Sequence, residues 1–356
     1  MDDKTHKIGK EIRVQGARIA GVVSCVPSTT INNVHFEKTF EPTEIANVVK
    51  MIGVETRRWV DAETTTSDLC TTAAKYLLEK LQWSPDSIDA VLFISQTPDH
   101  VLPASACVIQ KALGLPTQTI AFDVNLGCSG YVYALWLGMT MIQSGAAKRV
   151  ILAVGDTISK IVNPEDRSTA LLFGDAGTAT ALEACISDST AHFILGSDGA
   201  GAKDLIVPNS GFRNSAATHS ATSPSSTASD SYLYMNGGEI FNFTLRTIPA
   251  LVSDLMSNAH TSLDQQDYFL FHQANLFMLN HLVKKTKIPK EKAPINIQDY
   301  GNTSSASIPL LMTSSLSAEL STKECQISMF GFGVGFSWAA ANLKVGPLAC
   351  VETIER

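Results

Sequence analysis

Three polar residues lie where apolar segments of the chain give way to helical patterns, and their side chains could carry out covalent chemistry. Cys128 lies in FDVNLGCSGYVYALWLGM, where an apolar strand breaks before a glycine and an apolar helix begins just after the thiol. Unpaired N–H groups and the positive end of a helix dipole both favour a thiolate. We therefore expect a nucleophilic thiol with a pKa below the ordinary value of about 8.5.

The other two residues are less specific when each is considered alone. His272 closes the apolar segment FLFHQAN, where a core histidine with a satisfied hydrogen bond is the simpler interpretation. Asn302 lies in YGNTSSASIP, and asparagine is common in such turns for conformational reasons. Cys128 alone could be a buried, inert cysteine. In combination the three are informative, because each lies where a strand or loop leads into a helix, in the order Cys, His, Asn.

Short apolar runs alternate with longer helical patterns, which predicts an α/β fold with ligands bound at the strand ends. In the first half we expect strands at Val91–Ser95, Thr119–Val124, Arg149–Gly155 and Thr178–Leu182, and helices at Ser67–Leu81 and Ser129–Ser144. In the second half we expect strands at Tyr268–His272, Pro294–Gln298, Gln326–Phe330 and Ser337–Leu343, and helices at Asn275–Lys285 and Ser307–Leu320. Residues 212–230, rich in Ser, Thr and Ala, predict a flexible loop that is a linker rather than a lid.

Composition narrows the class of protein. The 356 residues are 45% apolar and 17% charged, which is typical of a globular protein with a large core. A net charge of −7 argues against nucleic acid as the main partner. No apolar run reaches the roughly 18 residues of a membrane span, and the N-terminal segment is polar. Scattered cysteines without a CxxC or HExxH motif predict reduced thiols, a cytoplasmic location and no metal site.

Five segments in order resemble the β-ketoacyl-acyl-carrier-protein synthase III branch of the thiolase-fold enzymes: FDVNLGCSGYVYAL, PEDRSTALLFGDAGTA, FHQAN, YGNTSSASIP and FGFGVGFSWAA. The resemblance runs from about Arg18 to Leu343. It implies a thiolase-like duplicated fold of five layers (αβαβα), with one half over residues 1–185 and the other over 186–356, and a homodimer. It also implies condensation of an acyl starter, from acyl-CoA or acyl carrier protein, with malonyl-acyl carrier protein, and no cofactor.

The resemblance also implies a role for each site residue. Cys128 would hold the acyl group as a thioester. His272 and Asn302 would hydrogen-bond the malonyl thioester carbonyl and stabilise the enolate that forms when carbon dioxide leaves. The backbone N–H groups of Cys128 and Gly333 would form the oxyanion hole.

Further positions follow from the same resemblance. Phe330 would be a wall of the acyl pocket, with a simple core aromatic as the alternative. Leu102 would limit acyl length, reaching across the dimer, with ordinary packing as the alternative. Arg167 would contact the coenzyme A nucleotide. Lys284 and Lys285 would form a basic docking surface for acyl carrier protein, although a solvated lysine end of an amphipathic helix is an equal alternative.

The resemblance breaks down at the entrance to the site. Where the family carries a tryptophan and an arginine that stack on the adenine of coenzyme A, this chain has Asn47 and Met51. Phe277 replaces a docking arginine. The usual binding of the coenzyme A adenine is therefore not expected, and the acyl donor could arrive on a carrier protein.

Other functions stay open at the level of sequence. The same fold could transfer an acyl group to oxygen or nitrogen, or serve as a non-catalytic subunit of a heterodimer. A cysteine hydrolase lacks its usual local signature here. The GFGVG segment leans toward the chalcone-synthase branch, but the surrounding segments fit that branch less well. GFGVG is followed by a strand pattern rather than a helix, which disfavours a nucleotide loop.

Overall fold

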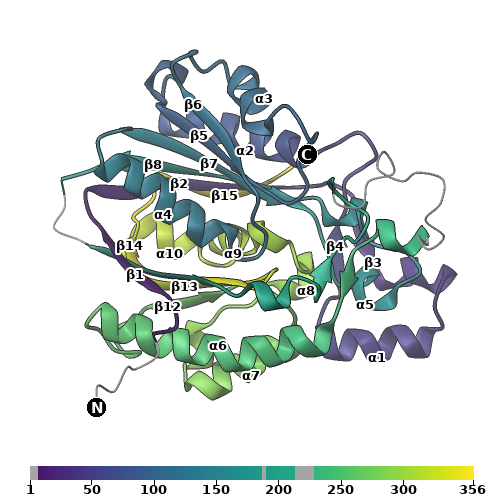
Figure 1. Ribbon diagram of the computed structural model, residues 1–356. Coiled ribbons are helices and arrows are strands. Elements are labelled where there is room, and N and C mark those ends of the chain that lie inside the picture. Colours follow the sequence, from purple (N-terminus) through teal and green to yellow (C-terminus); the bar gives the residue numbers. More distant parts are fainter. Residues whose placement is uncertain (1–6, 187–189, 213–227) are drawn as a thin grey trace.

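The computed structural model describes residues 7–186, 190–212 and 228–356, which build two large mixed sheets (Figure 1). The six-stranded sheet has the order β15-β2-β8-β7-β5-β6 and the five-stranded sheet the order β1-β9-β14-β13-β12. The first contains β2 Ala17–Val26, β5 Ala90–Ile94, β6 Ile120–Val124, β7 Arg149–Asp156, β8 Ala176–Ala184 and β15 Cys350–Glu355. The second contains β1 Lys10–Val14, β9 Ala191–Ser197, β12 Tyr268–Phe271, β13 Cys325–Gly333 and β14 Ser337–Val345. Two short two-stranded sheets pair β3 Thr30–Asn32 with β4 Thr56–Arg58 and β10 Leu205–Ile206 with β11 Tyr234–Met235.

Helices separate and cover the sheets, giving five layers. The outer helices on the six-stranded sheet are α2 Thr66–Leu81 and α3 Ser105–Ala112. The central layer contains α4 Gly130–Gln143, α9 Ser307–Ser315 and α10 Ser317–Thr322 (Figure 1). The outer helices on the five-stranded sheet are α6 Gly237–Asn258 and α7 Leu276–Thr286. Beside these layers lie α1 Pro42–Ile52, α5 Arg167–Ala170 and α8 Ile297–Tyr300. The predicted five-layered fold is confirmed.

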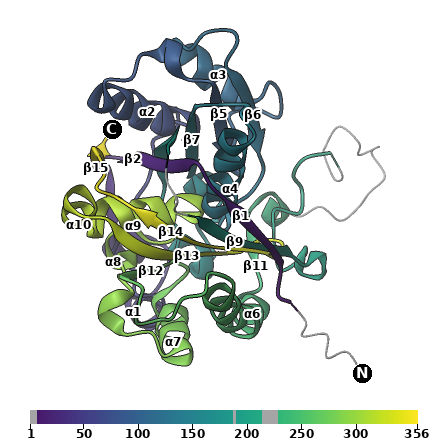
Figure 2. The same cartoon turned by 90° about the vertical axis from the view of Figure 1, so that its left-hand side faces the viewer.

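The terminal strands join the sheets of opposite halves. β1 pairs antiparallel with β9, and β15 pairs parallel with β2 (Figure 2). Each half of the chain therefore supplies a strand to the sheet that the other half builds. These two edge strands tie the halves of the chain together.

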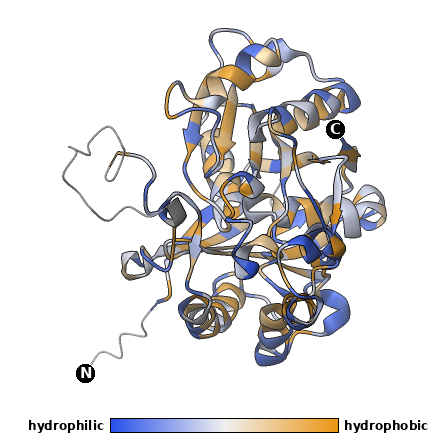
Figure 3. Ribbon diagram, turned by 90° about the vertical axis from the view of Figure 1, so that its right-hand side faces the viewer, coloured by the Kyte–Doolittle hydropathy of each residue, from blue (hydrophilic) through white to orange (hydrophobic). Residues whose placement is uncertain are grey.

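Helix α4 shows why the layers form. Its sequence GYVYALWLGMTMIQ has no charged residue, and it contacts β7 and β5 of one sheet as well as β13 and β14 of the other. A helix that is apolar all round is stable only when it is covered on all sides. The outer helices instead mix hydrophobic and hydrophilic residues around their surface (Figure 3). Gly138 allows the close approach of α4 to the sheet, because a Cβ there would lie 2.7 Å from Leu182 Cδ1.

Most predicted elements are present with small shifts of their ends, but two predictions were wrong. Pro294–Gln298 is not a strand: helix α8 begins at Ile297, and Ile295 and Ile297 pack in the cluster beneath α1. A short apolar run does not distinguish a strand from a buried turn of helix. The predicted helix Ser307–Leu320 is two helices that meet at Leu316. Of the predicted loop 212–230, residues 213–227 lie outside the described residues.

Candidate active site

Cys128 lies directly before the N-cap of α4, which is Ser129. It is 8% exposed and lines a cavity of about 390 Å³ together with Gln96, Phe173 and Ser304. The residue before it, Gly127, leaves room for the side chain of Gln96, whose Oε1 would have to move if a Cβ were added there. The predicted position at a helix N-terminus is confirmed.

The expectation of a lowered thiol pKa was wrong for the free protein. Burial raises the pKa of Cys128 to about 12, and the nearby charge of Asp156 acts in the same direction. Hydrogen bonds from the Ser304 hydroxyl and from the backbone of Cys128 and Val334 lower this pKa only in part. The sequence revealed the helix end but not the depth at which the thiol lies. The resting sulfur is therefore a thiol whose proton must leave during attack.

The loop that follows β13 approaches the sulfur of Cys128 closely. Gly333 is the last residue of β13, and a Cβ there would lie 2.7 Å from Cys128 Cβ and 2.9 Å from its Sγ. Gly333 thus provides the close approach, whereas the backbone group that hydrogen-bonds the sulfur belongs to Val334. The Ser337 hydroxyl donates to Val334 O (2.6 Å) and lies 2.7 Å from the hydroxyl of Ser129, which joins this loop to the start of α4. GFGVG connects two strands, β13 and β14, which removes the nucleotide-loop interpretation.

His272 follows β12 and is 2% exposed. Its Nδ1 lies 2.7 Å from the Ser307 hydroxyl, and its ring packs edge-on against Phe332. Burial lowers the pKa of His272 to about 3, and a hydrogen bond to the backbone of Ser304 offsets this effect only partly. The imidazole is therefore neutral at physiological pH and can act as a hydrogen-bond donor rather than as a charged group.

Asn302 is held by hydrogen bonds at both ends of its amide. Its Oδ1 accepts from the N–H of Ser304 (2.9 Å), and its Nδ2 donates to Ala274 O (3.3 Å), two residues after His272. These bonds fix which way the amide faces, and Nδ2 keeps a second hydrogen for a ligand. The backbone of Asn302 forms an isolated parallel bridge with Phe173, which lines the Cys128 cavity.

The structure therefore brings Cys128, His272 and Asn302 together, and Ser304 is the residue that joins them. Its hydroxyl lies 3.9 Å from Cys128 Sγ, and its backbone contacts both Asn302 and His272. Sequence reasoning missed both Ser304 and Val334. Both lie inside segments that had been recognised, but the sequence could not show which backbone or hydroxyl group faces the sulfur.

Two predicted pocket residues do not line the Cys128 cavity. Phe330 lies on the opposite face of β13, where it stacks on Phe271 with ring centroids 5.0 Å apart, within the core beneath α6 and α7. The prediction of an acyl-pocket wall is corrected: two residues further along, Phe332 is the aromatic in contact with His272. Leu102 is 77% exposed in this single chain, so its predicted role depends on a partner subunit.

The residues predicted at the donor entrance do come together. A cavity of about 820 Å³ is lined by α1, α5 and the first turns of α6 and α7, and it includes Asn47, Met51, Arg167 and Phe277. Arg167 forms an ion pair with Glu44 at the edge of this cavity. The surroundings are largely apolar, with side chains from Val48, Ile52, Leu172, Met235, Phe241 and Met278.

The predicted docking lysines lie at the exposed C-terminal end of α7. Lys285 Nζ donates to Leu245 O of α6 at 2.8 Å, which gives this lysine a structural contact within the chain. Lys284 precedes it on the exposed surface. Phe277, at the other end of α7, stacks on Phe241 and on His281.

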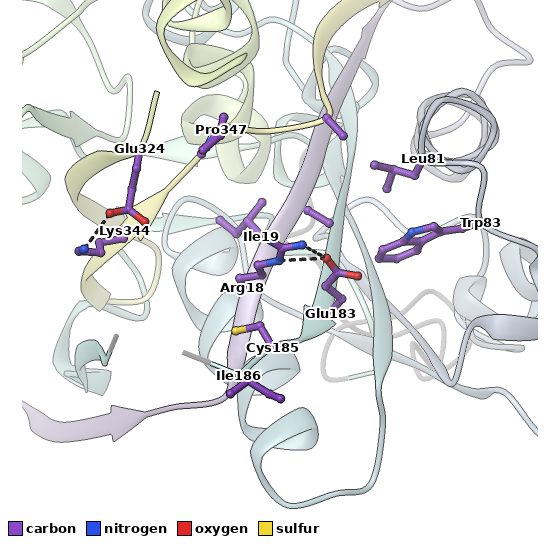
Figure 4. A pocket seen from close by; sticks show the side chains of 13 residues that line it. Arg18, Ile19, Leu81, Trp83, Glu183, Cys185, Ile186, Glu324, Lys344 and Pro347 are labelled. Carbon is purple, nitrogen blue, oxygen red and sulfur yellow. Dashed lines mark hydrogen bonds and ion pairs between the residues drawn. The ribbon is translucent and has the colours of Figure 1, made fainter. Parts of the chain in front are cut away.

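A further cavity, of about 420 Å³, is lined by none of these residues (Figure 4). Its charged side chains pair with each other, Arg18 with Glu183 and Lys344 with Glu324. In the described part of the chain, no three acidic, cysteine or histidine side chains come together as a metal site would require. Among the same residues, no helix has the length and apolar character needed to cross a membrane. All seven cysteines are free thiols.

Comparison with known proteins agrees with this geometry. Family models for 3-oxoacyl-[acyl-carrier-protein] synthase III match residues 122–202, and those for its C-terminal part match residues 256–345. A β-ketoacyl-[acyl-carrier-protein] synthase III of Clostridium perfringens is 33% identical over 93% of this chain and 100% of its own length.

Solved structures give the same result. A crystal structure of a 3-oxoacyl-(acyl-carrier protein) synthase from Burkholderia xenovorans LB400 is 57% identical, with a TM-score of 0.93 over 98% of this chain and 99% of that chain. A 3-oxoacyl-[acyl-carrier-protein] synthase III from Aquifex aeolicus is 29% identical, with a TM-score of 0.81 over 92% and 100% of the two chains. The chain belongs to the β-ketoacyl-acyl-carrier-protein synthase III family.

Proposed function

We propose that this chain condenses an acyl starter with the malonyl group of malonyl-acyl carrier protein and forms a β-ketoacyl product, as in the initiation of fatty acid synthesis. The observation that carries the proposal is that a buried thiol, a neutral histidine and an asparagine amide all contact the same residue, Ser304. An uncharged His and Asn pair suits stabilisation of an enolate oxygen. A hydrolase uses its histidine as a general base. The imidazolium that then forms needs a carboxylate or similar partner to stabilise it.

In the first step Cys128 Sγ attacks the carbonyl carbon of the starter thioester. The new carbon–sulfur bond forms as the bond to the donor's sulfur breaks, and the thiol proton passes to the departing thiolate. The tetrahedral oxygen would be held by the backbone N–H groups of Cys128 and Val334. These donors are fixed in place before the reaction, which is what makes such a site effective in a buried environment.

In the second step the malonyl carbon–carbon bond breaks and carbon dioxide leaves. The electron pair moves onto the thioester as an enolate, whose oxygen accepts hydrogen bonds from Asn302 Nδ2 and from the ring of His272. The enolate carbon attacks the acyl group on Cys128, and the released cysteine sulfur takes up a proton. The substrates supply every reacting group, so the proposed reaction needs no cofactor.

We further propose that the starter arrives on acyl carrier protein in preference to coenzyme A. The entrance cavity is apolar, and Arg167, its lining cation, is already paired with Glu44. Asn47 and Met51 offer neither charge nor a stacking surface to a phosphorylated nucleotide. A pantetheine arm, which is uncharged beyond its phosphate, matches such a cavity better, and Lys284 remains exposed for an acidic carrier.

A homodimer is also part of the proposal. Edge strand β6 ends the six-stranded sheet, and apolar side chains are exposed beside it at Leu102, Val108 and Ile120. An unpaired strand edge flanked by apolar residues favours pairing with another chain. In a pair joined there, Leu102 could reach the partner's acyl pocket.

Substitutions should separate the two steps. Cys128→Ser should reduce acyl transfer to the protein by about a thousandfold or more, because the nucleophile itself is lost. Asn302→Ala should leave acylation within a few-fold of normal but slow condensation about a hundredfold, because it removes an enolate donor. Intact-mass measurement of the acyl adduct and assay of carbon dioxide release test both.

Asn342→Ala, at an equally buried asparagine of β14, is the matched control and should affect stability alone. Equal loss of both steps in Asn302→Ala would refute this division of roles.

The decarboxylation step should be insensitive to pH near the ordinary pKa of histidine. Because burial lowers the pKa of His272 to about 3, the ring stays neutral from that pH upward. Carbon dioxide release from malonyl-acyl carrier protein by a Cys128→Ala variant should therefore vary little between about pH 5 and pH 8. A decline on acidification with a midpoint near 6.5, the unshifted value, would show that the ring titrates and that the assignment is wrong.

The donor preference can be measured with three thioesters of the same acyl group, carried by coenzyme A, pantetheine and acyl carrier protein. The wild-type chain should acylate from coenzyme A no faster than from pantetheine, because the nucleotide finds no partner. Glu44→Gln frees Arg167 and should raise the ratio of coenzyme A to pantetheine rates by up to about tenfold. Glu183→Gln, which breaks the comparable pair with Arg18, should leave the ratio unchanged. A wild-type preference for coenzyme A well above tenfold would exclude the proposed donor.

A further inference from the structure

We propose that Ser304 is a fourth functional residue of the site, whose hydroxyl holds the sulfur of Cys128 while its backbone positions Asn302 and His272. The inference deepens the proposed function, since it assigns a residue to the same site, and it rests on that function only for its substrate assays.

The hydroxyl of Ser304 faces the sulfur inside the molecule. Its Oγ lies 3.9 Å from Cys128 Sγ, and both residues line the same cavity. In the described part of the chain, no other side chain lies within hydrogen-bonding distance of this sulfur. Ser304 is 3% exposed, and its Oγ would lie 3.2 Å from a Cβ placed on Gly127. The hydroxyl is therefore packed between the glycine and the thiol, with water largely excluded.

The backbone of Ser304 has a separate role. Its N–H donates to Asn302 Oδ1 at 2.9 Å and so fixes the direction of the amide hydrogens. A backbone hydrogen bond also joins Ser304 to the ring of His272. These contacts do not involve the hydroxyl, so removal of the side chain should leave them in place.

Ser304 adopts a backbone conformation that its type disfavours. Its φ of 49° lies in the left-handed region, where a residue with a Cβ is strained. Glycine would relieve that strain, so conformation alone does not account for a serine at this position. The hydroxyl toward Cys128 provides the reason.

A buried carboxylate anchors the turn in this position. Asp156, the last residue of β7, is fully buried, and its Oδ2 accepts from the hydroxyl (2.7 Å) and N–H (3.2 Å) of Ser305. Its Oδ1 accepts from the N–H of Gln96 at 2.7 Å and from the hydroxyl of Ser95 at 3.0 Å. Within the described residues it forms no ion pair, so these donors, together with the hydroxyl of Ser304, are what compensate its burial. Asp156 thereby links two segments, one from each half of the chain, that both line the Cys128 cavity.

The hydroxyl would act whenever the sulfur carries negative charge. As Cys128 attacks the starter, and again when it leaves the condensed product, Ser304 donates a hydrogen bond to the developing thiolate. Ser304 keeps its own proton in both events, while the thiol proton moves to and from the sulfur as described above. The hydrogen bond stabilises the thiolate relative to the thiol. This stabilisation is needed because burial of the sulfur destabilises the thiolate.

The test is Ser304→Gly, which removes the hydroxyl and accepts the left-handed φ without strain. The rate constant for alkylation of Cys128 by iodoacetamide, followed by peptide mass mapping at one pH, should fall about tenfold, the effect expected of one hydrogen bond to a charged group. Acylation by the starter should fall similarly. Carbon dioxide release should be equal in Cys128→Ala and in Cys128→Ala/Ser304→Gly, because the contacts to Asn302 and His272 are retained.

Controls distinguish this role from a structural one. Gln82→Gly replaces another non-glycine residue of positive φ (53°), at the C-cap of α2, and should change stability without changing alkylation. Ser304→Ala, which keeps the Cβ, should reproduce the slower alkylation if Ser304→Gly does not fold.

Two results would overturn the inference. Unchanged alkylation in folded Ser304→Gly would show that the hydroxyl is idle. A parallel fall in alkylation, acylation and carbon dioxide release would show that the residue acts only through the backbone. Alkylation needs no substrate, so its outcome stands apart from the proposed function, which would fail instead if no thioester acylated the wild-type chain.

Discussion

The burial of helix α4 between two sheets fixes the geometry on which the rest of the site depends. The helix has no charged residue and packs against strands of both halves, so it cannot shift without exposing apolar surface on one side or the other. Cys128 precedes its first turn and is therefore placed by the core rather than by a mobile loop. The same burial that fixes the thiol also raises its pKa, so the chain needs hydrogen-bond donors around the sulfur.

Those donors come from segments that are distant in sequence. The turn at residues 302–305 faces Cys128 from one side, and the hairpin between β13 and β14 approaches it from the other. Buried hydrogen bonds link each of them to the first half: Ser305 to Asp156, and Ser337 to Ser129. Polar groups that are buried and fully paired specify one arrangement, because any displacement would leave a donor or acceptor unsatisfied. The site is thus assembled at the interface between the two halves of a duplicated fold.

Much of this could be predicted from the sequence, for physical reasons that also explain the failures. Alternating apolar runs identified the central strands, and the apolar helix after Cys128 identified a buried α4, because periodicity reports burial directly. The same signal could not identify α8, where a short apolar run is compatible with either structure. It also could not show that the face of β13 that carries Phe330 packs in the core beneath α6 and α7. Phe332 lies on the same face, two residues further along, and is the aromatic that contacts His272. Likewise, a glycine-rich segment indicates close approach, as Gly333 confirms, but not that the backbone of Val334 contacts the sulfur. The pKa of Cys128 depends on depth, and no local pattern reports depth.

The central claim is that Cys128 carries an acyl group that is then condensed with a decarboxylated extender. Intact-mass spectrometry of the wild-type protein, after incubation with a panel of acyl thioesters and then with malonyl-acyl carrier protein, tests it most directly. The account predicts a single acyl mass on the peptide containing Cys128, which disappears when the malonyl substrate is added, with release of carbon dioxide and formation of a β-ketoacyl carrier protein. An adduct on another residue, the absence of any adduct across the panel, or discharge of the acyl group to water at the same rate without malonyl substrate would contradict it.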